Sequence, residues 1–135
     1  MAIWTTDDRL EPVPEPLRQI LDLVLPDFQQ PSVIDAVFGY EPSTGTLWAS
    51  EPGHAGRSGF GPAEAHNRCW LVVQFADWLQ DQFFVESVGA WGKSRPACPG
   101  HRHPAQAREL GDEAVWICPV DGHLIAPVGQ IVQQT

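Results

Sequence analysis

The segment Trp70-Leu71-Val72-Val73-Gln74-Phe75-Ala76-Asp77-Trp78-Leu79 largely decides the fold. Apolar residues recur here at the three- and four-residue spacing of one broad helical face, and polar residues occupy the opposite face. The apolar face comprises Leu71, Val72, Phe75, Ala76, Leu79 and Phe83. We therefore predict one long core helix that begins at about Pro62, has Glu64 in its first turn and ends at Gly89.

Two further elements are predicted before this helix. Leu17, Ile20, Leu21 and Val24 follow helical spacing after Glu15-Pro16, and Pro26 cannot continue that helix. Residues 33–50 predict a β-hairpin, because two runs of β-forming residues flank the turn-forming sequence Glu41-Pro42-Ser43-Thr44-Gly45. Residues 1–16 predict an extended arm, and the glycine-rich residues 51–61 predict a loop.

Length and composition set the class of the molecule. The chain has 135 residues, of which 43% are hydrophobic and 19% charged, so we expect a single α+β domain. No apolar run approaches the roughly 20 residues that cross a bilayer. Residues 1–8 lack the basic and apolar regions of a secretory signal. The sequence therefore predicts a cytoplasmic protein without a membrane segment.

Charge is distributed unevenly along the chain. The formal net charge of −9 lies within residues 1–92, the expected acidic α+β core, whereas residues 93–135 are neutral and rich in histidine. An acidic body repels nucleic-acid phosphates and suits a basic protein partner. Solubility is the simpler explanation of such a charge, and as a binding partner we expect another protein. In the disfavoured alternative, nucleic acid would bind the basic residues of the tail, Lys93, Arg95, Arg102 and Arg108.

Cysteine and histidine gather in two segments of residues 93–135. These are Cys98-Pro99-Gly100-His101-Arg102-His103-Pro104 and Cys118-Pro119-Val120-Asp121-Gly122-His123. A Cys-Pro turn with a nearby glycine lets backbone amides face a thiolate sulfur, as in a zinc knuckle. Mixed thiolate and imidazole donors favour zinc over Mg²⁺ or Ca²⁺, so we predict a zinc site. Its candidate ligands are Cys98, His101, His103, Cys118 and His123.

The chain between the two segments indicates how they meet. Leu110-Gly111-Asp112-Glu113 predicts a hairpin with a two-residue Gly-Asp turn. Pairing of Leu110 with Glu113 would place Cys118 opposite Ala105, beside the end of the first Cys-Pro segment. Residues 114–117 are then the second strand, and residues 124–126 are expected to continue as a third.

This region resembles a zinc ribbon, in which two knuckles at one end of a β-hairpin supply four ligands. The resemblance covers about residues 95–128 and departs from the C-x2-C…C-x2-C pattern at two positions, His101 and Asp121. Histidine is a conservative replacement, whereas aspartate is a harder and less usual ligand for structural zinc. The pattern C-P-G-H-x-H-P…W-x-C-P is also similar to that of small uncharacterised proteins of GC-rich bacteria, which implies no function.

The fourth ligand is open among three residues, which we rank as His103, then His123, then Asp121. His103 points the same way as His101 if that segment is extended. Gly122 can adopt the positive φ that folds His123 back over the ion. Two alternatives to a metal site are reduced core cysteines and a disulfide. The disulfide fits poorly with three cysteines and no secretory signal.

Weaker candidate sites lie elsewhere. His66 and Cys69, three residues apart on the predicted helix, have the spacing of a base and a nucleophile. Cys69 adjoins Trp70 and Leu71, however, and packing is the better interpretation. Gly56, Gly59 and Gly61 lack the order of a phosphate-binding loop. The six tryptophans are expected mostly in the core.

Two classes of function remain. We favour a non-enzymatic domain of adaptor or inhibitor type, whose metal fastens the C-terminal third to the α+β core and which binds a protein through its acidic face. The alternative is a small zinc-dependent hydrolase with three protein ligands, a metal-bound water and Asp121 or Glu113 as base. The number of protein ligands separates the two classes.

Overall fold

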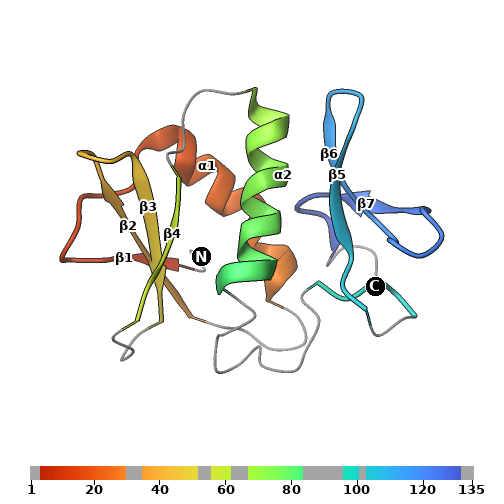
Figure 1. Ribbon diagram of the computed structural model, residues 1–135, viewed down its shortest axis with the longest axis horizontal. Coiled ribbons are helices and arrows are strands. Elements are labelled where there is room, and N and C mark those ends of the chain that lie inside the picture. The colour runs from red at the N-terminus through yellow and green to blue at the C-terminus, as the bar shows by residue number, and fades with distance from the viewer. Residues whose placement is uncertain are drawn as a thin grey trace.

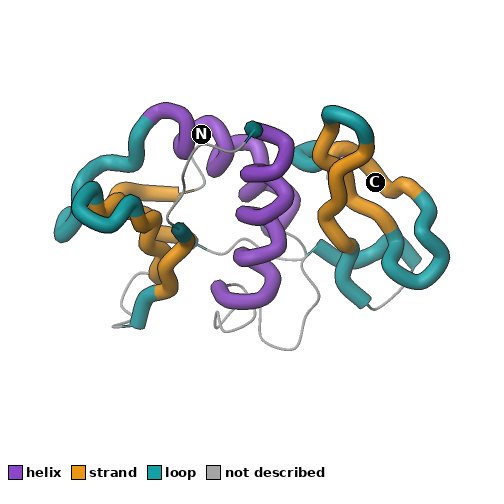
Figure 2. Tube along the Cα trace, turned by 45° about the horizontal axis from the view of Figure 1, so that its top comes forward, coloured by secondary structure: helices purple, strands orange, loops and turns teal. Residues whose placement is uncertain are grey.

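A computed structural model describes residues 4–29, 35–51, 56–61, 67–83, 96–100 and 103–131. It is a mixed α+β structure in which helix α2 (Arg68–Trp78) stands between two small sheets, as Figures 1 and 2 show from two directions. One sheet has the strand order β1 (Trp4–Thr6), β2 (Ala36–Glu41), β3 (Thr46–Ser50) and β4 (Ser58–Phe60). The other has the order β5 (Gln106–Leu110), β6 (Glu113–Ile117) and β7 (Leu124–Pro127).

Helix α1 (Glu15–Val24) confirms the first predicted helix and its boundaries. Pro16 occupies its first turn, and a 3-10 turn, η1 (Leu25–Phe28), follows and contains Pro26. The helix buries Leu17, Ile20, Leu21 and Val24, the four residues at helical spacing. Its apolar stripe therefore supplies one wall of the core, together with Leu25 and Phe28 of η1.

The first sheet contains the predicted hairpin and two strands that were not expected. Strands β2 and β3 pair antiparallel, with Glu41 opposite Thr46 across the predicted turn. Strand β1 pairs parallel with β2 inside the predicted arm, and β4 pairs with β3 inside the predicted loop. Both missed strands have only three residues, too few for a period-two pattern to be visible.

Helix α2 is shorter than predicted. Its N-cap is Asn67, whose backbone is extended and whose Oδ1 accepts a hydrogen bond from Trp70 N at 2.8 Å. A continuous helix from Pro62 is therefore wrong, because the helix begins only at Arg68. It ends at Trp78 and passes into a π-helical turn, η2 (Leu79–Phe83). Residues 62–66 and 84–95, which include Glu64 and Gly89, lie outside the described residues.

The second sheet confirms the predicted register. Leu110 lies opposite Glu113, and the pairing continues to Gln106 opposite Ile117. Strand β7 pairs antiparallel with β6, as the third predicted strand. Trp116 is fully buried and belongs to the same hydrophobic core as α2, which joins this sheet to the rest of the molecule.

A buried carboxylate fastens the second sheet to the end of α1. Asp27 in η1 is 0% exposed and accepts hydrogen bonds from Trp116 Nε1 at 2.7 Å, Gly129 N at 2.5 Å and Ile131 N at 3.1 Å. Burial raises the pKa of the Asp27 carboxyl, and these three hydrogen bonds oppose that rise. The rings of Phe28 and Trp116 meet edge to face beside it, 5.9 Å apart.

In the part of the chain that the structure describes, neither helix has the length and apolar content that a bilayer crossing requires.

Replacing Asp27 tests this junction. Asp27→Ala should lower the free energy of unfolding by at least about 3 kcal/mol, because the buried Trp116 indole and two half-buried backbone N–H groups lose their acceptor. Asp27→Asn should lose less, because one carbonyl oxygen can still accept. Asp8→Ala, at an exposed turn position, is the control and should change stability by no more than about 0.5 kcal/mol. Chemical denaturation measures all three; a stable Asp27→Ala protein would contradict the role of this junction.

Candidate metal centre

The first loop of the candidate site is closed by backbone hydrogen bonds. Cys98 N donates to His103 O at 3.0 Å, and Ala105 N donates to Pro96 O at 2.9 Å. Ala97 and Pro104 form an isolated antiparallel bridge between them. This ladder holds Cys98 and His103 side by side at the base of the loop, immediately before β5. Residues 101 and 102 lie outside the described residues, so the structure gives no position for His101.

The second loop, between β6 and β7, repeats that arrangement. Cys118 N donates to His123 O at 2.9 Å, and Gly122 N donates to Cys118 O at 2.8 Å. Each loop thus has the sequence Cys-Pro-x3-His, closed by a bond from the cysteine N–H to the carbonyl of the histidine five residues later. The sequence contains this five-residue spacing twice, but the comparison with zinc ribbons considered only residues three positions after each cysteine.

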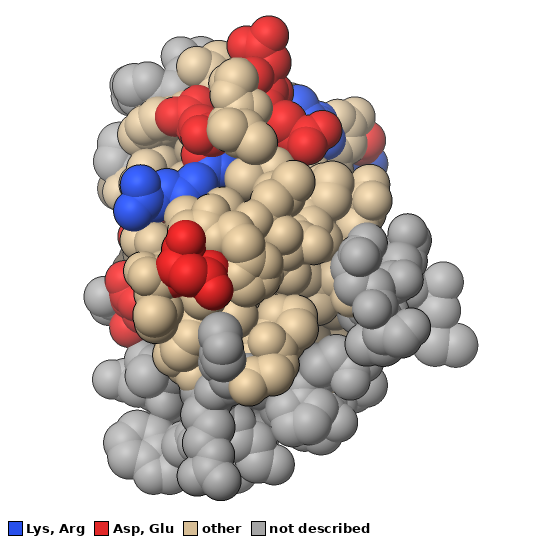
Figure 3. Space-filling model, turned by 90° about the vertical axis from the view of Figure 1, so that its right-hand side faces the viewer, with Lys and Arg blue, Asp and Glu red and all other residues tan. Residues whose placement is uncertain are grey.

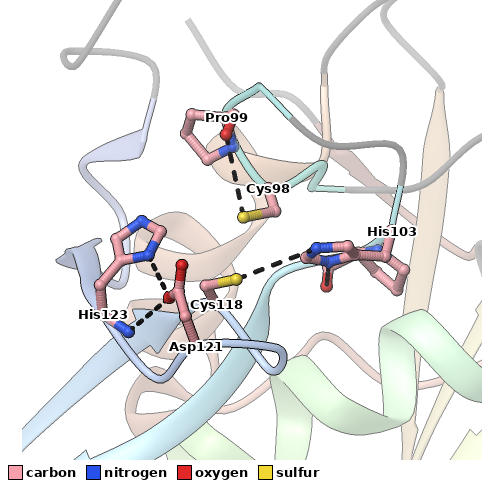
Figure 4. Close-up of polar contacts among 7 residues, drawn as sticks. Cys98, Pro99, His103, Cys118, Asp121 and His123 are labelled. Carbon is pink, nitrogen blue, oxygen red and sulfur yellow. Dashed lines mark hydrogen bonds and ion pairs between the residues drawn. The ribbon is translucent and has the colours of Figure 1, made fainter.

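Three side chains from the two loops converge. The ligand atoms of Cys98, His103 and Cys118 all lie within 4.8 Å of one another. Figure 4 shows the two sulfur atoms and the His103 ring directed toward a common space. Cys118 Sγ is 3.9 Å from His103 Nε2. A tetrahedral zinc ion would separate such a pair by about 3.6 Å, so the three residues are close to a ligating arrangement.

Asp121 and His123 lie on the other side of Cys118. The ligand atoms of these three residues also lie within 4.8 Å of one another. Asp121 Oδ1 accepts both bonds from His123, from the backbone N at 2.9 Å and from Nδ1 at 2.5 Å. The Asp121 carboxylate lies between Cys118 and the His123 ring (Figure 4). Both residues that ranked below His103 in the sequence are thus beside the cluster.

Burial and charge differ across the site. Cys98 and Cys118 are 1% and 0% exposed, whereas about half of the Asp121 and His123 side chains is exposed. Burial, followed by the neighbouring Cys118 and Asp121, raises the pKa of the Cys98 thiol to about 11. The two bonds from His123 hold the pKa of Asp121 at about 2. A cation bound beside Cys98 would oppose this rise by favouring the ionised thiolate.

Cys69, a weaker candidate from the sequence, is not part of this cluster. Cys69 lies on α2, where burial and then Glu109 raise its thiol pKa, so it is a poor nucleophile. His66, its suggested base, is outside the described residues. None of the three cysteines forms a disulfide in this structure.

Comparisons of the chain with protein-family models, curated proteins and solved structures find no match.

The second loop depends on one backbone conformation. Gly122 has φ of 78°, in the left-handed region that favours glycine, and a side chain there would meet no heavy atom within 4 Å. Gly122→Ala should therefore destabilise the fold by about 1 kcal/mol through backbone strain alone. Gly56→Ala, which also meets nothing within 4 Å and lacks a positive φ, should be nearly neutral. Equal thermal melts for the two variants would contradict the loop geometry.

Proposed function

We propose that this chain is a small acidic zinc-binding domain that acts without catalysis, as a protein-binding module of adaptor or inhibitor type. The convergence of Cys98, His103 and Cys118 from two separate loops is the observation that carries the proposal. A metal bound there would join the chain before β5 to the turn between β6 and β7. Its binding free energy would add to the stability of the second sheet.

The donor set supports zinc as the ion. Two thiolates and an imidazole are the soft and borderline donors that zinc binds in structural sites, while Mg²⁺ and Ca²⁺ prefer oxygen. The near-complete burial of both thiols supports a structural role, because it leaves little room for a substrate on that side.

We assign the fourth position to Asp121. His123 already bonds to Oδ1 twice, which leaves Oδ2 of the same carboxylate for the ion. In this assignment His123 is a positioning residue, since ligating carboxylates are commonly held by such hydrogen bonds. His103, ranked first from the sequence, stays a ligand in this proposal, whereas Asp121 moves above His123.

Exposed acidic groups support a protein partner. Glu109, Asp112 and Glu113 are exposed at the turn between β5 and β6. Figure 3 shows acidic side chains gathered at that end of the second sheet, above a broad face with little charge. With a net charge of −9, the domain suits a basic surface better than a phosphate backbone.

Metal content tests the proposal directly. Protein purified without added metal should contain close to one zinc per chain by mass spectrometry, and removal of the zinc by a chelator should lower the melting temperature. Cys98→Ser and Cys118→Ser should lose the zinc, because each removes a thiolate donor. Cys69→Ser, on α2 and outside the cluster, is the matched control and should retain it. Purified protein with no transition metal and with freely titrating Cys98 and Cys118 would reject the proposal.

The fourth donor is tested by a pair of variants. Asp121→Ala should weaken zinc affinity by about a hundredfold through loss of a ligand. His123→Ala should weaken it by only about tenfold, because the backbone N–H of residue 123 still bonds to the carboxylate. Competition with a chromophoric chelator measures both affinities. The reverse order would identify His123 as the ligand and Asp121 as its positioning residue.

A hydrolase is the second candidate, and the exposure of the Asp121–His123 pair favours it. In that case a water would take the fourth position, and Asp121 would act as base toward it. Turnover of an activated phosphoester or ester by the zinc-loaded protein, abolished by Asp121→Ala with zinc still bound, would favour this candidate. Loss of zinc in the same variant would favour the closed site.

A further inference from the structure

A hollow of about 410 Å³ lies between β4 and α2, on the opposite side of the helix from the metal loops. We call it the aromatic hollow. Its aromatic walls are Phe60, Trp70 and Trp78, and it is also lined by Leu71, Asp77 and Asp81. Its volume falls within the roughly 300–1,000 Å³ of ligand-binding sites. The described residues that line it include none of Cys98, His103, Cys118, Asp121 and His123.

The aromatic walls are well supported by the fold. The ring centroid of Trp78 lies 5.7 Å from that of Phe75, with the rings stacked, and 5.5 Å from that of Phe60. Trp70 is two helical turns earlier on the same face, next to the N-cap of α2. Both tryptophans pack against the hydrophobic core and are half-buried, whereas Trp116 is fully buried. An indole that is already held in place on a helix loses little side-chain entropy when a ligand packs against its ring.

Negative charge in the aromatic hollow is not balanced by its own lining. Asp77 and Asp81 are exposed and one helical turn apart, and no basic residue is among the described residues that line the hollow. Burial raises the pKa of Asp77, and repulsion by the like charge of Asp81 raises it further. A cation placed between the indoles and these carboxylates would relieve that repulsion.

We propose that the aromatic hollow binds an arginine side chain of a partner protein, through Trp70 and Trp78 on its walls and Asp77 and Asp81 at its edge. This inference rests on the proposed role in protein binding and supplies its anchor, but it does not depend on zinc. The guanidinium group is planar, stacks on indole and donates two parallel hydrogen bonds to a carboxylate. A lysine ammonium can do neither the stacking nor the forked bonding.

The first sheet already contains one contact of this kind. The guanidinium carbon of Arg57 lies 4.6 Å from the ring centroid of Trp48. Trp48 also donates from Nε1 to Glu41 at 3.3 Å, so a cation, an indole and a carboxylate meet there within one chain. The described lining of the aromatic hollow contains indoles and carboxylates, the two groups that accompany the cation at Trp48.

Indole N–H signals in NMR spectra test the proposal with the full chain. The probe is a seven-residue Gly/Ser peptide with one central arginine, compared with peptides that carry citrulline or lysine at that position. The arginine peptide should shift the Trp70 and Trp78 signals saturably, and the neutral citrulline peptide should bind about tenfold more weakly. Equal binding of citrulline, equal binding of lysine, or no shift at millimolar peptide would overturn the proposal.

Charge variants provide the control. Asp77→Asn and Asp81→Asn should each weaken the arginine peptide about threefold, and the double variant about tenfold. Asp112→Asn makes the same change in net charge at an exposed turn of the second sheet and should change binding by less than about twofold at physiological salt. If Asp112→Asn weakened binding equally, the net charge of the domain would explain the binding, and the proposal would be overturned. Zinc content measured on the same samples separates this result from that of the metal centre.

Discussion

The carboxylate of Asp27 is the constraint on which the arrangement of the two sheets depends. It is fully buried, yet it satisfies one indole N–H and two backbone N–H groups that belong to the second sheet and the chain after it. A buried charge is tolerated only when its hydrogen bonds are complete. The junction therefore accepts only the position of the sheet in which Trp116, Gly129 and Ile131 all reach the same side chain. Apolar packing around Phe28 and Trp116 adds stability but would tolerate more than one docking angle.

Local rules predicted the elements whose partners are close in sequence. Helix α1 followed from four apolar residues and two prolines, and the β5–β6 register followed from a two-residue turn, because that turn fixes which residues pair. Strands β1 and β4 were missed because they exist only through pairing with β2 and β3. Asp27 was also missed, since a lone aspartate after Pro26 gives no sign that its three donors lie far along the chain. The start of α2 was visible in Asn67, a strong N-cap residue, but the acidic Glu64 suggested an earlier start.

The candidate site shows the same division between local and distant signals. Its cysteines were expected to meet because the hairpin register places Cys118 near the first loop, and the structure brings their thiols together with His103. The structure gives no position for His101, the histidine at ribbon-like spacing, whereas His103 and His123 each close a loop with the cysteine five residues earlier. A wider loop moves the donor set, and in the second loop it also places Asp121 against His123. Ligand spacing is thus a consequence of loop closure and is less informative than the backbone bonds that set it.

The long sequence separation of the Asp27 contacts has a consequence for the order in which the protein forms. Its acceptor groups belong to η1, whereas two of its donors are 102 and 104 residues later. During synthesis α1, β2 and β3 emerge well before those donors, and domains begin to compact as their residues leave the ribosome. Until Gly129 and Ile131 are available, Asp27 must remain hydrated, and the core around Phe28 cannot close over it. The closure of the core around Asp27 is therefore coupled to the arrival of the residues that follow β7.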